Sequence, residues 1–177
     1  MSEVVILEFV NLFCAGLLAG AEFVVRFGVR RSVAVLDQQP QVQLRQALIR
    51  RLRVMVPSVY APTTLSAVAV TVLAGTGAGF GFRCAALLAM LLWTLTTFLG
   101  TVPINAATLT WRPDSPPDNW RAIVSKWERL DTVRFWTVVI AFALFLTAAA
   151  LRLASDQALQ QTGHANNGLL HSTAHPA

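Results

Sequence analysis

Residues 133–153 read VRFWTVVIAFALFLTAAALRL, an apolar run whose only charged members, Arg134 and Arg152, stand near its two ends. Three further runs of similar length and composition precede it. A helix needs about 20 apolar residues to cross the hydrocarbon core of a bilayer. The sequence therefore predicts an all-α fold, a bundle of four transmembrane helices at about 4–27, 54–74, 84–105 and 132–153.

The composition also indicates a membrane protein. Of the 177 residues, 55% are hydrophobic and only 13% are charged, whereas a soluble domain carries about a quarter charged residues. We interpret residues 1–154 as one membrane domain that has the lipid bilayer as its partner. Residues 155–177 are polar, so a disordered tail is expected there. The histidines all lie in this tail, as His164, His171 and His175, and would need an ordered backbone to bind a metal.

The basic residues lie on one side of the predicted membrane. A net charge of +5 and a pI near 10.6 are common in nucleic-acid-binding proteins, but here the charge follows the helices. The loop from Gly28 to Arg53 holds six arginines and one acidic residue, and the loop 105–132 adds four basic residues. The other side holds only Arg83 and Arg152. By the positive-inside rule, both loops are cytoplasmic and both termini are outside. We therefore expect no nucleic-acid partner, and a place in the inner (cytoplasmic) membrane of a bacterium.

Small residues on the first helix predict a close helix contact. Gly16 and Gly20 stand four residues apart, and such a pair lets two helix backbones approach closely. The neighbouring helix belongs either to this chain, to a second copy in a homo-oligomer, or to a larger membrane partner.

Polar side chains gather at one end of the predicted helices. Alternating passes bring every second helix end to the same face, so the ends marked by Glu22, Tyr60, Asn105 and Arg134 lie together. Ionisable groups are costly inside a membrane, and a group of them marks a candidate site. A polar stripe on the third helix leads to the same end and is formed by Trp93, Thr94, Thr97, Thr101, Asn105 and Thr108.

Two more sets of residues share a helix face near this end. At 100° per residue, Asn11 falls on the same stripe of the first helix as Glu22. Trp127, Asp131 and Arg134 follow spacings of four and three and fall on a common side of the last helix. At that spacing, Asp131 and Arg134 are expected to form a local ion pair.

Motifs near the cytoplasmic helix ends carry a family resemblance. They are Val102-Pro103-Ile104-Asn105, Pro116-Pro117, Trp120, Trp127-Glu128-Arg129-Leu130 and Val133-Arg134. Together with the spacing of the four spans, they resemble the anthrone oxygenase-like family of small four-helix membrane proteins. Named members of that family are associated with the oxidation of anthrones to anthraquinones by O₂ without a bound metal or flavin. Similar sequences often have histidine where this chain has Asp131.

The resemblance implies a membrane-embedded, cofactor-independent oxygenase-like protein that acts with O₂ on a lipophilic aromatic or enolisable substrate of the anthrone type. The spans contain no histidine and no cluster of carboxylates, so haem and di-iron sites lack their usual ligands, and we expect neither cofactor nor metal. Such a reaction needs a base, for which Glu22 or Asp131 would serve, and donors to the developing oxyanion. The candidate catalytic residues are Glu22, Asn105, Asp131 and Arg134. The candidate substrate-binding residues are Asn11, Tyr60, Trp93, Thr97, Thr101 and Trp127.

Two other classes of function stay open. Glu22 can simply neutralise Arg134 or Arg26 across the bundle, in which case the chain is a non-catalytic membrane subunit that packs with a partner or self-associates. A small transporter has less support, because the four short helices show no internal repeat.

Overall fold

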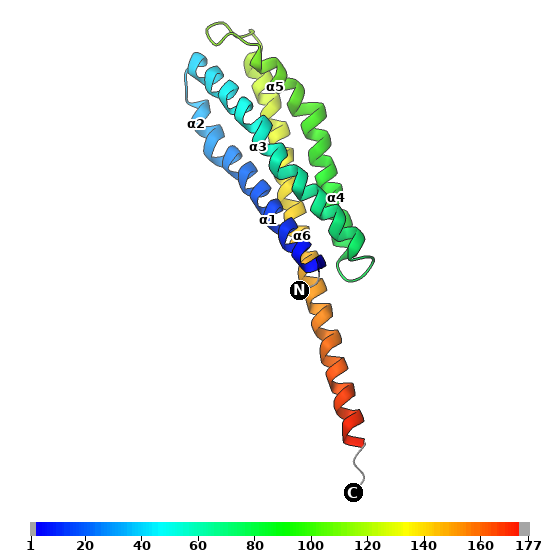
Figure 1. The fold of residues 1–177 in the computed structure, drawn as a ribbon. Coiled ribbons are helices and arrows are strands. Elements are labelled where there is room, and N and C mark those ends of the chain that lie inside the picture. The colour runs from blue at the N-terminus through cyan, green and yellow to red at the C-terminus, as the bar shows by residue number, and fades with distance from the viewer. Residues whose placement is uncertain (1–2, 174–177) are drawn as a thin grey trace.

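The computed structural model describes residues 3–173, with side chains described as far as residue 163. Over this range the chain is helical between its turns and has no strand (Figure 1). Four long helical rods follow one another, and two of them contain a π-helical segment, labelled η. The rods are α1 (Glu3–Phe23) with η1 (Val24–Val29) and α2 (Arg30–Ala34); α3 (Gln38–Leu73); α4 (Phe80–Leu95) with η2 (Thr96–Thr101) and α5 (Val102–Leu109); and α6 (Trp120–Thr173).

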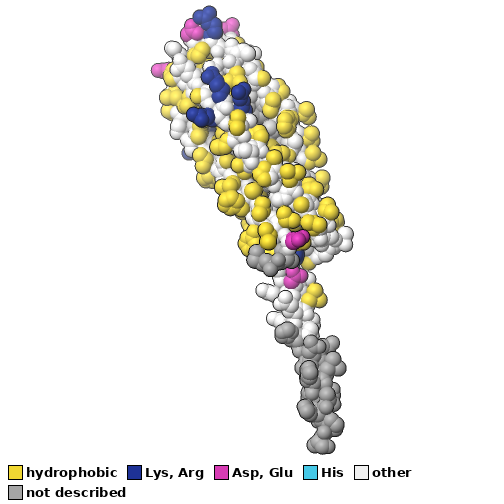
Figure 2. Space-filling model, viewed as in Figure 1, with side chains coloured by type: hydrophobic (Ala, Val, Ile, Leu, Met, Phe, Trp, Pro, Cys, Tyr) yellow, Lys and Arg dark blue, Asp and Glu magenta, His cyan; other side chains and the backbone are white. Residues whose placement is uncertain are grey.

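Each rod is long and apolar enough to cross a membrane, which confirms the four predicted spans. Large hydrophobic side chains are exposed along all four rods, and Figure 2 shows hydrophobic side chains spread over the visible face of the bundle. Lipid solvates such a surface, whereas water does not. The fold is therefore the one expected of an integral membrane protein.

Successive rods are antiparallel. The connections 35–37 and 110–119 lie at one end of the bundle, which we call the loop end (Figure 1). The start of α1 and the turn 74–79 lie at the other, which we call the turn end. Ion pairs set the register of the first and last rods: Glu8 lies 2.9 Å from Arg152 near the turn end, and Arg30 lies 2.6 Å from Glu128 near the loop end.

The second rod starts well before its apolar run. α3 begins at Gln38 instead of near residue 54. Asp37 before it is extended, and Pro40 falls in the first turn, where a backbone N–H has no helical partner in any case. Pro57 and Pro62 lie inside α3 without ending it. Nearby hydroxyl groups bond back to carbonyls of the same turns, which helps to satisfy the backbone around these prolines.

The last rod also extends beyond its apolar run. The sequence predicts disorder from residue 155, whereas α6 continues as a helix to Thr173. No proline occurs between Pro117 and Pro176, and a helix that packing has already nucleated adds residues readily. The side chains of His164, His171 and His175, which raised the question of a metal site, lie outside the described residues.

Two groups of buried side chains hold the rods together. The larger group lies within the membrane part and comprises Ala15, Leu18, Ala67, Ala86, Met90, Trp93, Val138, Ala141 and Phe145. The smaller lies at the loop end, where Val42 packs against Trp111 and Trp120. There Gln46 Nε2 also donates to the carbonyls of Thr108 (3.0 Å) and Trp111 (2.9 Å). The rods therefore stay packed beyond the apolar belt.

The turn end closes onto α6 through backbone contact. Gly79 has a φ of 81°, and a Cβ at this position would lie 2.6 Å from the carbonyl oxygen of Ala148. Arg83, which is buried, donates to the carbonyls of Gly75 (3.0 Å) and Ala78 (3.3 Å). This guanidinium therefore serves the carbonyls of the turn, as a C-terminal cap does.

Candidate functional site

A buried ion pair joins the first and last rods inside the apolar belt. Arg134 of α6 donates to Glu22 Oε1 of α1, and both side chains are buried, with 4% of Glu22 exposed. Trp93 of α4 donates its indole N–H to the same oxygen at 3.1 Å. The Arg134 guanidinium also lies 4.9 Å from the centre of the Trp93 ring. Three candidate site residues from three rods are thus in direct contact.

Tyr60 extends this group to α3. Its ring stacks on Trp93 with centroids 4.6 Å apart and an interplanar angle of 18°. The Tyr60 hydroxyl bonds with Thr94. Two of the candidate substrate-binding residues, Tyr60 and Trp93, therefore stack on each other in this structure.

Asp131 lies one turn from Arg134 on α6 and differs from the other charged groups. Only 1% of this residue is exposed, and neither carboxylate oxygen has a hydrogen-bond partner among the described residues. The local ion pair expected between Asp131 and Arg134 does not form, because Arg134 turns to Glu22 instead. A buried polar group without a partner is uncommon in proteins and calls for an explanation.

The polar stripe of the third rod reaches the level of this carboxylate. A Cβ on Gly100 would lie 2.8 Å from Leu130 Cδ1, and Trp127 Nε1 donates to Asn105 Oδ1 at 3.1 Å. With the two rods antiparallel, this register sets Thr97 and Thr101 level with the turn from Leu130 to Arg134. The hydroxyls of Thr97 and Thr101 are buried and, over the described part of the chain, also lack partners.

The backbone is unusual at the same level. η1 (Val24–Val29) begins two residues after Glu22, and η2 (Thr96–Thr101) contains both unpaired threonines. In η2, the Thr96 hydroxyl donates to the Leu92 carbonyl of its own helix at 2.8 Å, as a helical threonine usually can. The hydroxyls of Thr97 and Thr101 make no such bond. π-Helical turns are rare and often occur at functional sites.

A charged network of Glu128, Arg30 and Arg45 lies on the loop-end side of the site and was not predicted from the sequence. Glu128 lies 2.6 Å from Arg30 and 3.5 Å from Arg45, and so joins α2, α3 and α6. The Arg45 guanidinium lies 5.7 Å from the centre of the Trp127 ring. One signal was available: Glu128 stands in the middle of a basic loop and needs basic partners. Which arginines it selects depends on the register of α6.

The structure separates two candidates, Asn105 and Asn11, from the group around Glu22. Asn105 bonds Trp127 and lies twelve residues of helix from Trp93, about 18 Å along the axis. Because Trp93 contacts Glu22, the prediction that Asn105 lies together with Glu22 and Tyr60 is wrong.

Asn11 is separated in the opposite direction. Its side chain donates to the Thr63 carbonyl at 3.0 Å and to Ser66 Oγ at 3.3 Å. Eleven residues of helix separate it from Glu22, about 16 Å along the axis. Asn11 therefore shares a stripe with Glu22, as predicted, but bonds α1 to α3 in the other half of the membrane part.

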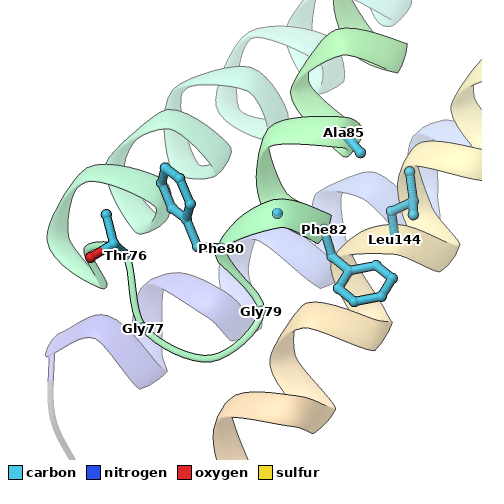
Figure 3. Close-up of a pocket in the computed structure, with 8 residues that line it drawn as sticks. Thr76, Gly77, Gly79, Phe80, Phe82, Ala85 and Leu144 are labelled. Atoms are coloured by element: carbon cyan, nitrogen blue, oxygen red, sulfur yellow. The ribbon is translucent and has the colours of Figure 1, made fainter.

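Two cavities lie away from the group formed by Glu22, Arg134, Trp93 and Tyr60. The larger is an open groove of about 500 Å³ at the turn end, where Phe80 and Phe82 at the start of α4 and Leu144 of α6 surround it (Figure 3). It has no ionisable lining residue. The smaller, of about 10 Å³, adjoins Glu8, Asn11 and Arg83 and has room for about one water molecule. Neither cavity is lined by Glu22, Asp131 or Arg134.

No set of three His, Cys, Asp or Glu side chains in the described part of the chain is arranged to hold a metal ion. No protein-family model matches the chain, and no curated protein or solved structure shows significant similarity to it. A function for this protein must therefore be inferred from the polar site itself.

Proposed function

We propose that this protein is a membrane-embedded, cofactor-independent oxygenase-like enzyme that oxidises a lipophilic aromatic or enolisable substrate of the anthrone type with O₂. The observation that carries the proposal is the Asp131 carboxylate, buried in the bundle without a hydrogen-bond partner among the described residues. A protein retains such a group at a cost in stability, which is understandable if the group performs chemistry. The resemblance of the loop motifs to the anthrone oxygenase-like family points to the same chemistry.

In the proposed reaction, the Asp131 carboxylate accepts a proton from an acidic C–H beside the substrate carbonyl, and a resonance-stabilised carbanion remains. This carbanion is oxidised by O₂, and loss of water leaves a new carbonyl group, so that CH₂ and O₂ become C=O and H₂O. The developing enolate oxygen needs hydrogen-bond donors. Arg134 Nε and the hydroxyls of Thr97 and Thr101 are buried donors without partners in the described structure.

The orientation that we propose has the loop end in the cytoplasm and both termini outside. All Lys and Arg residues except Arg83 and Arg152 lie in the loop-end half of the chain's helices and connections. The positive-inside rule supports this orientation. A bacterial inner membrane fits it, and the substrate would then enter from the cytoplasmic leaflet.

A second function is favoured by a different observation. Glu22, Arg134, Trp93 and Tyr60 contact one another, as they would in a bundle that only needs to neutralise its buried charge. A Cβ on Gly20 would meet nothing within 4 Å, so α1 offers a small-residue surface to the lipid. The alternative is therefore a non-catalytic subunit that packs with a partner or self-associates.

The test is oxygen-dependent turnover by the purified protein in nanodiscs. A panel of anthrones is added under air and under argon, and quinone absorbance and O₂ consumption are followed together. Empty nanodiscs give the rate of spontaneous oxidation. The proposal expects a protein-dependent rate under air with one O₂ consumed per quinone. A rate equal to that of empty nanodiscs for every substrate would favour the non-catalytic alternative.

A further inference from the structure

An aromatic patch on the membrane-facing surface lies directly outside the buried ion pair. Phe27 is the centre, with ring centroids 4.9 Å from Phe23 and 5.5 Å from Phe135, and Phe135 lies 5.1 Å from Trp136. Phe23, Phe27 and Trp136 are 54%, 45% and 53% exposed. We call these four residues the aromatic patch. Phe135 is only 5% exposed and lies beside both Phe27 and Trp136, so the surface that a further ring can contact is formed by Phe23, Phe27 and Trp136.

Arg26 brings a positive charge into the aromatic patch. Its guanidinium lies 5.5 Å from the ring centre of Phe27 and 5.4 Å from that of Phe135. Its Nη1 donates to Thr132 Oγ1 at 2.6 Å, but no carboxylate of the described chain lies within ion-pair distance of it. A cation at the edge of an apolar belt is costly unless an anion or a dipole compensates it. The patch therefore combines an apolar aromatic surface with a cation that has no ion-pair partner in the described chain.

The aromatic patch also adjoins the proposed site along the chain. Phe23 follows Glu22 on α1, and Phe135 follows Arg134 on α6. Thr132, which binds Arg26, follows Asp131. Between Phe23 and Arg30, the backbone is the π-helical segment η1. A molecule on this patch would thus rest against the outer side of the residues to which we assign the chemistry.

We propose that Arg26 and the aromatic patch form the docking surface for a flat aromatic lipophile that carries an acidic oxygen and arrives from within the bilayer. The identification of this lipophile as the substrate rests on the proposed function, whereas the docking itself does not. The rings favour an aromatic ligand because they can pack against its ring. The Arg26 guanidinium favours a phenolate, enolate or carboxylate, and the position in the apolar belt favours a lipophilic molecule. A phospholipid would pair with Arg26 through its phosphate and contact the rings through its acyl chains, but it has no ring of its own to pack against them.

A binding experiment without turnover tests this surface. The protein in zwitterionic-lipid nanodiscs is kept under argon, and equilibrium dialysis measures binding of 2-naphthoate, an aromatic anion, and decanoate, an aliphatic one. Empty nanodiscs correct for partition into lipid. The Phe27→Leu/Trp136→Leu double variant, called the patch variant, is compared with Phe9→Leu/Phe13→Leu. This control changes two exposed phenylalanines that lie outside the patch on the same rod as Phe27. Arg26→Gln tests the charge, with uncharged naphthalene as the reference ligand.

We expect the wild-type protein to bind 2-naphthoate in preference to decanoate. The patch variant should lose about tenfold in naphthoate affinity, while the Phe9/Phe13 variant keeps it, and Arg26→Gln should remove the preference for naphthoate over naphthalene. Equal losses in the two double variants would overturn the proposal. So would a change of oligomeric state in the patch variant by native mass spectrometry, since a second copy would then cover this face.

A measurement on the unmodified protein guards against variants that fail to fold. A photoreactive naphthoate should label peptides that contain residues 23–27 and 135–136, and labelling confined to other parts of the chain would contradict the proposal. The outcomes also separate the two proposals. Naphthoate binding without any anthrone turnover keeps the docking surface and rejects the oxygenase, whereas anthrone turnover together with unchanged naphthoate binding in the patch variant keeps the enzyme and rejects the docking surface.

Discussion

Asp131 and Arg134 lie one helical turn apart on α6, yet Arg134 bonds across the bundle to Glu22 and leaves the Asp131 carboxylate without a hydrogen-bond partner in the described chain. At longer range, Asp131 interacts with the charges of Glu22, Arg134, Arg30, Arg26 and Arg45. One buried carboxylate is thus compensated and the other is held free. This difference underlies the roles that we propose for them.

The free carboxylate should lower the stability of the bundle. Asp131→Asn removes the charge without changing the shape of the side chain, so we expect the free energy of unfolding to rise by about 1–2 kcal/mol. Thermal unfolding in nanodiscs would show this as a higher Tm. Asp114→Asn, at an exposed residue of the loop 110–119, is the matched control and should change stability by less than about 0.5 kcal/mol. A Tm for Asp131→Asn below that of the wild type would contradict this interpretation.

Removing the charge of Glu22, the compensated carboxylate, should instead lower the free energy of unfolding. Glu22→Gln leaves the buried Arg134 without its carboxylate, and loss of one member of a buried pair costs about 3–5 kcal/mol. In the double variant Glu22→Gln/Arg134→Met both charges of this pair are removed, so it should be more stable than Glu22→Gln alone. A double-mutant cycle on unfolding free energies measures this coupling. Additive effects of the two substitutions would mean that the pair is not coupled.

The turn end depends on a glycine at one position. Gly79→Ala would put a Cβ 2.6 Å from the Ala148 carbonyl oxygen at a φ of 81°, and strain and overlap together should cost at least about 2 kcal/mol. Gly81→Ala is the control, because nothing lies within 4 Å of its Cβ position and it falls inside α4. We expect the Tm to fall for the first variant only. Similar values for both would show that the turn does not pack against α6.

The packing of α3 against the segment 105–120 at the loop end depends on Gln46. Gln46→Leu removes two hydrogen bonds to the carbonyls of Thr108 and Trp111, and leaving these groups without partners should cost about 1–3 kcal/mol. Hydrogen exchange should become faster in the segment 105–120. Gln43→Leu changes an exposed residue of the same helix and should leave exchange unaltered. Unchanged protection in the Gln46 variant would indicate that Val42, Trp111 and Trp120 hold α3 against this segment by themselves.

The fold was predictable because the four apolar runs each satisfy the length that a bilayer requires. The pairing of Glu22 with Arg134 was one of the alternatives that the sequence left open. By contrast, the prediction of an ion pair between Asp131 and Arg134 was wrong. Spacing along α6 does not reveal that Glu22 of α1 competes with Asp131 for Arg134. The π-helical segments η1 and η2 were not foreseen either, since they depend on how the rods pack. The helical extension of α6 beyond residue 154 was missed because hydropathy marks the membrane, whereas a helix ends at its own stop signals.

The role proposed for Asp131 is that of the base in an oxygen-dependent reaction, and it is tested by the initial rate of quinone formation from an anthrone. The rate is compared in nanodiscs for the wild type, Asp131→Asn, Asp131→His and Asp114→Asn. We expect a loss of about 100-fold or more in Asp131→Asn, a substantial rate in Asp131→His, which restores a base, and no change in Asp114→Asn. A wild-type rate in correctly folded Asp131→Asn would show that this carboxylate is not the base.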